Sequence, residues 1–218
     1  GALCRHADLE RSSLLATRQP TMAAAAPLVA DPIVRNRGTL VGSLCHADPQ
    51  GDWASVMVSL DGLVVAQGPR GRRTIAVKEL VHGPFQTTLA YDEIVVEAIA
   101  PAPKGTPAGG YLKLERRVGD FATVGVAVSV DRTGEEVSRA GIGLTGVGAS
   151  TISADDAAQV LVGGPLTADA IGEAAALAAQ AAQPRTDHRG SASYKRHLVS
   201  VFTRRILTGL IRSEEEAA

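Results

Sequence analysis

The sequence predicts an α+β protein built from two domains. Three observations support this class. Helical and strand-like patterns are segregated along the chain, a stretch rich in proline and glycine (residues 100–110, APAPKGTPAGG) divides it, and three strand-like runs are followed by three helical ones after that stretch. We therefore expect one domain over residues 1–102 and a second over residues 108–218, with an antiparallel three-stranded sheet covered by helices in the second.

The first half begins with helical patterns. Residues 5–15 and 21–29 read as helices, and Pro27 must lie in a first turn or kink the second one. Asp48 is expected to cap a further helix that has Pro49 at its first position and stops at Gly62.

Strand patterns follow. Residues 63–66 and 74–77 form a hairpin signal around the turn GPRGRR, and residues 93–99 are a further strand candidate. The strands expected in the second half are residues 111–117, 123–131 and 137–147, of which the last two are joined by a turn at 132–134.

Three helices complete the second half. Ser153 with Asp156 predicts a capping box for the first helix, and Thr167 can cap the second. After Ser191, apolar residues recur at four-residue spacing and predict a long amphipathic helix that buries one stripe: Leu198, Phe202, Ile206 and Leu210.

Composition excludes several functions. The 218 residues are 45% hydrophobic with a formal net charge of −1, and Lys plus Arg number 22 against 23 for Asp plus Glu, so a nucleic-acid-binding surface is not expected. No apolar run approaches the roughly 20 residues that span a bilayer, and we expect a cytoplasmic protein. Cys4 and Cys45 cannot supply the four thiolates of an iron–sulfur cluster, and no second ligand pair supports zinc at Cys45 and His46, so Cys45 is expected to be a packing residue.

Residues 33–53, IVRNRGTLVGSLCHADPQGDW, carry the strongest functional signal. Gly38 and Gly42 flank Thr39 in a turn that allows main-chain amides to approach a ligand, and Thr39 and Ser43 add hydroxyl groups. A turn that leads into a helix start suits a phosphate group. An ordinary tight turn is the alternative interpretation.

This segment resembles the flavin-binding signature of the medium subunits of molybdenum hydroxylases, the xanthine dehydrogenase and carbon monoxide dehydrogenase family, in which RNxGTIGGxLxHADPxxD is typical. Residues 187–198, DHRGSASYKRHL, resemble the stretch that closes the C-terminal domain of the same subunits. The resemblance implies part of a PCMH-type FAD-binding domain followed by the flavoprotein C-terminal domain. The family's second glycine motif, usually AGGxS, does not occur in these residues, so we expect the chain to be truncated at its N-terminus.

The resemblance also implies how FAD is held. Main-chain amides and the Thr39 hydroxyl would bind the pyrophosphate, and the stretch involved is Thr39, Leu40, Val41, Gly42 and Ser43. Val41 replaces a family glycine, and if a positive φ angle or close approach to a phosphate is needed there, strain of about 1–3 kcal/mol would weaken binding.

Further contacts are implied, and each has a plainer alternative. Asp52 would accept hydrogen bonds from the nucleotide part, near His46 and Asp48; alternatively these are a first-turn acid, a loop residue and a helix cap. Small apolar residues would press on the flavin ring or simply be core: Val29, Ala30 and Val95.

Outside these stretches, Lys113 would lie near the isoalloxazine and stabilise the reduced flavin, or be a solvated strand lysine. Phe121 stands where some relatives carry tyrosine. Arg189 and His197 are expected to anchor the last helix or a subunit contact.

The function implied is that of an FAD-binding electron-transfer subunit that is not active alone. Its partners would be a large subunit with the molybdenum cofactor and a small subunit with two [2Fe–2S] clusters, and the acceptor and the substrate cannot be read from this chain. A flavin-free structural subunit is the alternative. A stand-alone flavin oxidase is disfavoured, because the C-terminal half resembles the hydroxylase subunit.

Overall fold

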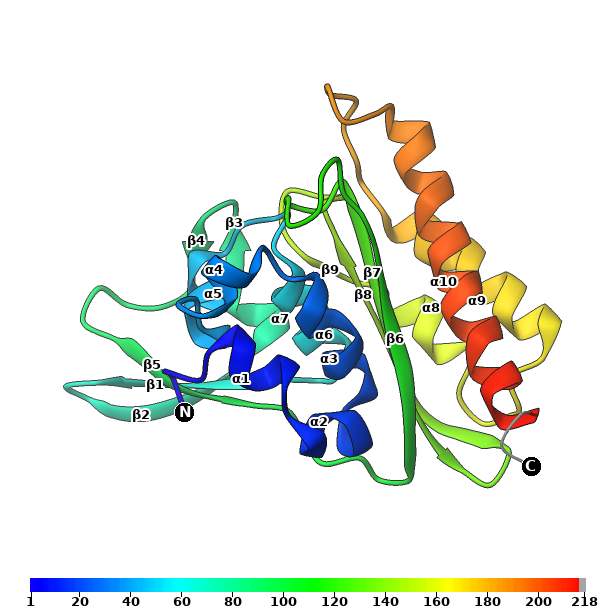
Figure 1. Cartoon of the computed structure of the whole chain (residues 1–218), viewed down its shortest axis with the longest axis horizontal. Helices are drawn as coiled ribbons and strands as arrows, with labels where there is room; N and C mark the ends of the chain where they lie inside the picture. Colours follow the sequence, from blue (N-terminus) through cyan, green and yellow to red (C-terminus); the bar gives the residue numbers. More distant parts are fainter. Residues whose placement is uncertain (216–218) are drawn as a thin grey trace.

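The computed structural model describes residues 1–215 of the chain, with side chains up to residue 211. Its centre is a four-stranded antiparallel sheet in the order β6-β7-β8-β9, seen edge-on in Figure 1 with helices on both faces. The strands are β6 (Thr106–Leu114), β7 (Val124–Thr133), β8 (Glu136–Thr145) and β9 (Ile152–Ser153). The prediction of three strands was therefore one short, since the two-residue β9 adds a fourth.

Strand β7 is buried on both faces, which explains its nearly continuous apolar sequence. Its alternating valines, beginning at Val124 and Val126, join the core beneath the C-terminal helices. Ala127, on the opposite face, joins the core beneath the N-terminal helices. The sheet thus separates two hydrophobic cores.

The C-terminal helices cover one face of this sheet (Figure 1). They are α8 (Asp155–Gln159), α9 (Ala168–Ala181) and α10 (Ala192–Glu215). Two expectations are confirmed: Thr167 caps α9 by accepting a hydrogen bond from the Ala170 amide, and the predicted stripe of α10 packs into the core. The capping box at Ser153 was wrong, because α8 begins at Asp155 and the Ser153 hydroxyl donates to the Asp155 carboxylate instead of accepting from a helical amide.

The other face is covered by short helices from the first half of the chain (Figure 1). They are α1 (His6–Glu10), α2 (Ser13–Arg18), α3 (Pro20–Ala25), a 3₁₀ turn (Ala26–Leu28), α4 (Pro32–Arg35), α5 (Leu40–His46), α6 (Asp52–Ser59) and α7 (Val77–Leu80). The single helix expected over residues 5–15 is broken, since Ser12 caps a new helix with its side chain. Pro27 lies in the first turn of the 3₁₀ segment, as its geometry requires.

Helix α6 begins later than its sequence predicts. Asp48 does not cap it; the Asp48 carboxylate instead accepts a hydrogen bond from the Gln50 amide, two residues on, and closes a turn. Gly51 becomes the N-cap and Asp52 the first helical residue. All eight residues of α6 are buried, so tertiary packing sets its start.

A second, smaller sheet projects from the N-terminal half, in the order β2-β1-β5 (Figure 1). Its strands are β1 (Leu63–Gly68), β2 (Gly71–Ala76) and β5 (Ile94–Ile99), and a two-stranded ribbon is formed by β3 (Val81–Gly83) and β4 (Gln86–Thr87). The predicted hairpin around GPRGRR is confirmed by antiparallel pairing of β1 with β2.

Glycines in the large sheet allow the two halves of the chain to meet closely. A Cβ at Gly143 would lie 2.0 Å from the Ser55 carbonyl oxygen of α6, and a Cβ at Gly141 would lie 2.1 Å from that of Ser59. A Cβ at Gly109 would meet the Thr21 hydroxyl of α3 at 2.1 Å. Part of the expected linker, residues 106–110, is therefore strand. Glycine at position 109 allows the strand to approach α3 closely and is not a sign of a flexible segment.

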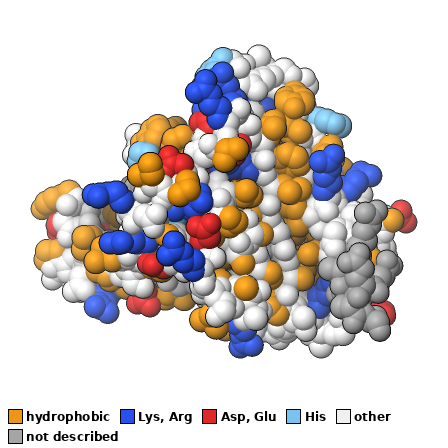
Figure 2. Space-filling model, in the orientation of Figure 1, with side chains coloured by type: hydrophobic (Ala, Val, Ile, Leu, Met, Phe, Trp, Pro, Cys, Tyr) orange, Lys and Arg blue, Asp and Glu red, His pale blue; other side chains and the backbone are white. Residues whose placement is uncertain are grey.

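Among the described residues, no helix is both long and apolar enough to cross a membrane. Figure 2 shows hydrophobic side chains gathered along the middle of one face, over β6, which is an edge strand of the large sheet.

Candidate functional site

The glycine-punctuated turn is the start of helix α5. Thr39 is its N-cap, with an extended backbone, and its Oγ1 accepts a hydrogen bond of 3.0 Å from the Gly42 amide. The Leu40 amide donates to the Cys4 carbonyl oxygen and the Ser43 amide to the Thr39 carbonyl oxygen. Most of the main-chain amides that the sequence assigned to a phosphate thus already donate hydrogen bonds within the protein. The O–H group of Thr39 can still donate a hydrogen bond.

Val41 has no positive φ angle, so that cause of strain is absent, while strain from close approach to a phosphate stays a prediction. It lies in the first turn of α5 and is absent from the residues with a positive φ angle. Its side chain is 6% exposed and packs, with that of Leu40, in the N-terminal core. A helical backbone accepts valine, and the core supplies apolar contacts for its methyl groups.

A small pocket of about 210 Å³ collects several of the residues singled out by sequence; we refer to it as the α6 pocket. It is lined by Val29, Ala30, Val34, Ser43, Gly51, Asp52, Gly119, Asp120 and Phe121. These residues come from four separate stretches of the chain. One side is apolar, and Ser43 and Asp52 supply polar groups.

Asp52 lines this pocket, and two residues of β6 that are not part of the lining bond to its carboxylate. Its carboxylate accepts a hydrogen bond of 2.6 Å from the Tyr111 hydroxyl and one of 3.1 Å from Lys113 Nζ. Burial raises the pKa of Asp52, opposed by the Lys113 charge and by these hydrogen bonds. Burial, followed by the charge of Asp52, raises the pKa of Tyr111 well above its usual value, so Tyr111 remains a donor.

Lys113 is held on three sides. Besides Asp52, its Nζ donates to the Leu28 carbonyl oxygen at 2.8 Å and lies 3.1 Å from Glu115 Oε2, an ion pair without hydrogen-bond geometry. Its side chain is only 2% exposed. The alternative of a solvated lysine was wrong, because the two carboxylates and the carbonyl make burial of the ammonium group tolerable.

The apolar wall of the pocket is the loop at Val29 and Ala30, and Arg35 fixes it from behind. Arg35 Nη1 donates to the carbonyl oxygens of Val29 at 3.2 Å and Ala30 at 2.7 Å, and Arg35 pairs with Glu10. Ala30 has a φ angle of 51°, an uncommon conformation for alanine. The Arg35 side chain thus stabilises this loop with Ala30 in a left-handed backbone conformation that alanine rarely adopts.

A second wall, which adjoins the first, is the connection between β6 and β7. Gly119 has a φ angle of 84°, and a Cβ there would lie 3.1 Å from the carbonyl carbon of Ala30. Any side chain at this position would therefore push the two walls apart. Phe121 beside it is 46% exposed at the pocket.

The remaining predicted site residues lie elsewhere. Val95 is buried in the N-terminal core and does not line the α6 pocket. His46 is exposed, and its ring contacts Phe85.

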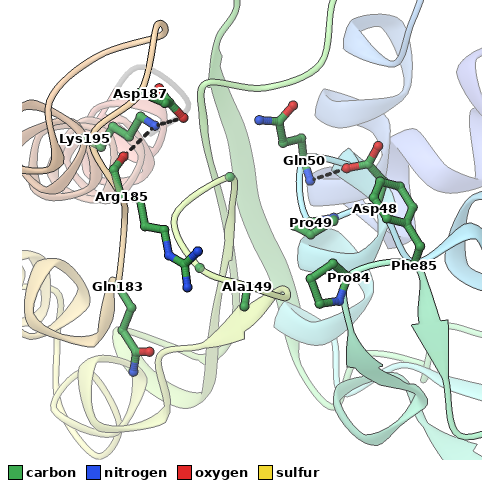
Figure 3. A pocket seen from close by; sticks show the side chains of 12 residues that line it. Asp48, Pro49, Gln50, Pro84, Phe85, Ala149, Gln183, Arg185, Asp187 and Lys195 are labelled. Carbon is green, nitrogen blue, oxygen red and sulfur yellow. Dashed lines mark hydrogen bonds and ion pairs between the residues drawn. The ribbon is translucent and has the colours of Figure 1, made fainter.

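Asp48 lines a larger pocket of about 450 Å³, which lies between residues 48–50 and the segment before α10 (Figure 3). In Figure 3 the Lys195 ammonium group bonds Asp187 and the Arg185 carbonyl oxygen. Although this pocket is larger, the α6 pocket is the better candidate site, because more of the predicted residues converge there.

Sequence reasoning missed Tyr111, Arg35 and Glu115. Tyr111 precedes Lys113 by two residues in a strand, so both side chains point to the same face, and this period could have indicated it. Arg35 is the first residue of the flavin-binding signature and lies only five and six residues after the carbonyl oxygens that it holds, so the motif could have indicated it. Among the described residues no cluster of three or more His, Cys, Asp or Glu is arranged for a metal, and Cys45 packs against the N-terminal core as predicted.

Comparison with protein-family models gives two matches. Residues 1–103 match the FAD binding domain in molybdopterin dehydrogenase, and residues 110–210 match the CO dehydrogenase flavoprotein C-terminal domain.

Among curated proteins, the chain is 35% identical to the carbon monoxide dehydrogenase medium chain of Hydrogenophaga pseudoflava over 95% of this chain and 72% of that protein. It is 37% identical to the nicotine 6-hydroxylase medium subunit of Paenarthrobacter nicotinovorans, with the same coverage. Among solved structures, carbon monoxide dehydrogenase from Hydrogenophaga pseudoflava superimposes with a TM-score of 0.90 at 36% identity, over 95% of this chain and 72% of that one.

Proposed function

Because the chain belongs to the family of FAD-binding medium subunits of molybdenum hydroxylases, we propose that it binds FAD at the α6 pocket and passes electrons between partner subunits and an acceptor. One observation carries the placement of the cofactor. Val29, Ala30, Ser43 and Asp52, which the resemblance assigns to FAD from separate parts of the sequence, line one pocket.

The residues of the pocket fit a flat ring system. Gly51 and Gly119 present no side chain, and at Gly119 none could be added without meeting the main chain of Ala30. Val29 and Phe121 offer apolar surface, and Ser43 and Asp52 offer hydrogen-bonding groups at the other side. The volume of about 210 Å³ is below the roughly 300–1,000 Å³ of small-molecule pockets, so the α6 pocket accommodates only part of a dinucleotide.

We assign the chain's own residues the following roles. The Thr39 hydroxyl accepts a hydrogen bond from the Gly42 amide as the helix cap, and its O–H group can donate to a phosphate oxygen at the start of α5. Lys113 does not line the pocket and acts through the groups that it bonds. Its positive charge is balanced by Asp52 and Glu115, so its main role is to orient the Asp52 carboxylate and the Leu28 carbonyl group. Bound FAD would supply the redox chemistry, and the protein its placement.

The proposal includes two partners. The relatives named above are medium chains or subunits, which by that description belong to larger assemblies. From its family we assign the molybdenum cofactor to a large partner subunit and two [2Fe–2S] clusters to a small one.

A second candidate is a flavin-free structural subunit of the same complex. The observation in its favour is that the Leu40, Gly42 and Ser43 amides are already satisfied inside the protein. Only part of the expected phosphate cradle is therefore free to bind an anion.

FAD content decides between the two candidates. The full-length protein, purified in its complex, is expected to carry FAD, measured by its absorbance and by release on denaturation. Ser43→Leu fills the pocket and is expected to lower FAD occupancy, whereas Ser13→Leu, an exposed position on α2, is the matched control and is expected to leave it unchanged. A wild-type complex without FAD, or full occupancy in Ser43→Leu, contradicts the proposal.

A further inference from the structure

One wall of the α6 pocket has little support of its own. The connection between β6 and β7 carries Gly119, Asp120 and Phe121 into the pocket lining. Val118 at its tip is 97% exposed and Phe121 is 46% exposed, so apolar packing does not fix this segment. At its β6 end, the Gly119 amide donates to Glu115 Oε1 at 3.3 Å.

Arg189, distant in sequence, holds the other end of this wall. Its Nη1 donates a hydrogen bond of 2.8 Å to the Phe121 carbonyl oxygen, and its Nη2 lies 3.6 Å from Asp120 Oδ1. That same carboxylate oxygen accepts a hydrogen bond from the Phe121 amide. The Arg189 side chain is only 13% exposed, which limits competition from water.

Arg189 is itself anchored to helix α10. Asp187 and Gly190 exchange two main-chain hydrogen bonds across a tight turn, and the Arg189 amide donates to Asp187 Oδ1 at 2.9 Å. Lys195 of α10, whose side chain is 4% exposed, pairs with Asp187 at 2.7 Å (Figure 3). A chain of polar contacts thus runs from α10 through the turn to the pocket wall.

We propose that Arg189 is a positioning residue for the cofactor site: it fixes residues 119–121 and so controls how tightly the α6 pocket holds its ligand and how far water reaches it. This inference rests on the proposed function, because it names FAD as the ligand. It gives the C-terminal motif a role in the cofactor site in addition to anchoring the last helix. Arg189 does not line the pocket and acts through the loop alone.

The test compares three variants of the full-length protein in its complex. Arg189→Met keeps the length of the side chain without its donors, and Arg189→Lys keeps the charge with one ammonium group. Arg185→Met is the matched control from the same segment; the Arg185 side chain lines the larger pocket, and its carbonyl oxygen, which accepts from Lys195, is retained.

The first measurement is amide hydrogen exchange of residues 116–122 without FAD. We expect Arg189→Met to speed exchange there about tenfold, since a hydrogen bond to a charged group is lost, with Arg189→Lys between it and the wild type and Arg185→Met unchanged. Unchanged exchange in Arg189→Met overturns the inference, whether or not FAD binds.

The second measurement is FAD affinity, together with iodide quenching of the bound flavin's fluorescence. Arg189→Met is expected to bind FAD about tenfold more weakly and to expose it to iodide, with partial rescue by lysine. Faster exchange with unaltered affinity and quenching means that Arg189 supports only the loop, and it overturns the positioning role. A wild-type complex that binds no FAD refutes the proposed function instead, and the exchange measurement still decides whether Arg189 holds the loop.

Discussion

At the scale of single residues, Val41 shows how burial changes the meaning of a substitution. Val41→Gly matches the typical family motif more closely, yet it removes a side chain that is 6% exposed from the N-terminal core and puts glycine in a helix. We expect it to lower the free energy of unfolding by about 2–4 kcal/mol, from lost apolar burial and helix propensity.

FAD affinity, measured by fluorescence titration at a temperature where both proteins are folded, is expected not to increase in Val41→Gly. Tighter FAD binding in that variant would show that valine does obstruct the cofactor and would restore the strain hypothesis.

His6 gives a residue-scale prediction about pH. Its Nδ1 accepts a hydrogen bond of 2.9 Å from Trp53 Nε1, so that nitrogen must be unprotonated. Burial, and then the charge of Arg35, lowers the pKa of His6 below its usual 6.5. A histidine with a lowered folded-state pKa contributes stability above the unfolded value, and the contribution is lost as pH falls through the folded value.

We therefore expect the wild-type protein to be more stable than His6→Gln near neutral pH, and the difference in melting temperature to shrink as pH falls below the ordinary histidine pKa of about 6.5 and then through the lowered pKa of His6. His82→Gln, which removes an imidazole at an exposed position in β3, is the matched control. A difference that stays constant with pH would mean that His6 does not titrate in this window.

At the scale of elements, the contact of α6 with β8 decides where Asp52 lies. Gly143 permits this contact, since any side chain there would meet the Ser55 carbonyl oxygen. Gly143→Val is expected to lower the free energy of unfolding in urea by about 1–3 kcal/mol or more through overpacking.

Gly172→Ala on α9, where a Cβ meets nothing within 4 Å, is the control and is expected to stabilise by about 0.5–1 kcal/mol. A Gly143→Val protein as stable as the wild type would show that α6 can move away from the sheet without cost.

Other elements were predictable because their signals are local. The hairpin of β1 and β2 and the cap and apolar stripe of the last helices depend on residues close in sequence. The turn between β7 and β8 was predicted at residues 132–134 and lies at residues 134–135, because β7 continues through Thr133. The start of α6 was not predictable in this way. Asp48 satisfies every local criterion for an N-cap, but the buried position of α6 against β8 moves the helix start to Asp52.

At the scale of the whole molecule, the two halves share their cores. Tyr111 and Ala127, which follow the expected boundary, are part of the N-terminal core, and α3 and α6 pack on the large sheet. We propose that residues 1–102 and 108–218 are two domains in the sense of sequence families but form a single folding unit. We therefore expect this chain to unfold in one transition.

Differential scanning calorimetry tests this, with the calorimetric and van't Hoff enthalpies expected to agree. Two resolved transitions, with Gly143→Val altering only one of them, would show that the halves are stable independently.

The sequence by itself determined the family, through two motifs in the right order, and most of the strands and the last helix, through periodicity and turn residues. Only the tertiary structure decided the chemical surroundings of the site. Asp52 and Lys113 lie 61 residues apart in sequence, and Arg189 and Phe121 lie 68 apart, yet each pair is joined by a hydrogen bond. Which residues form such long-range pairs depends on how distant segments of the chain pack against one another. Short-range sequence patterns contain no information about that packing.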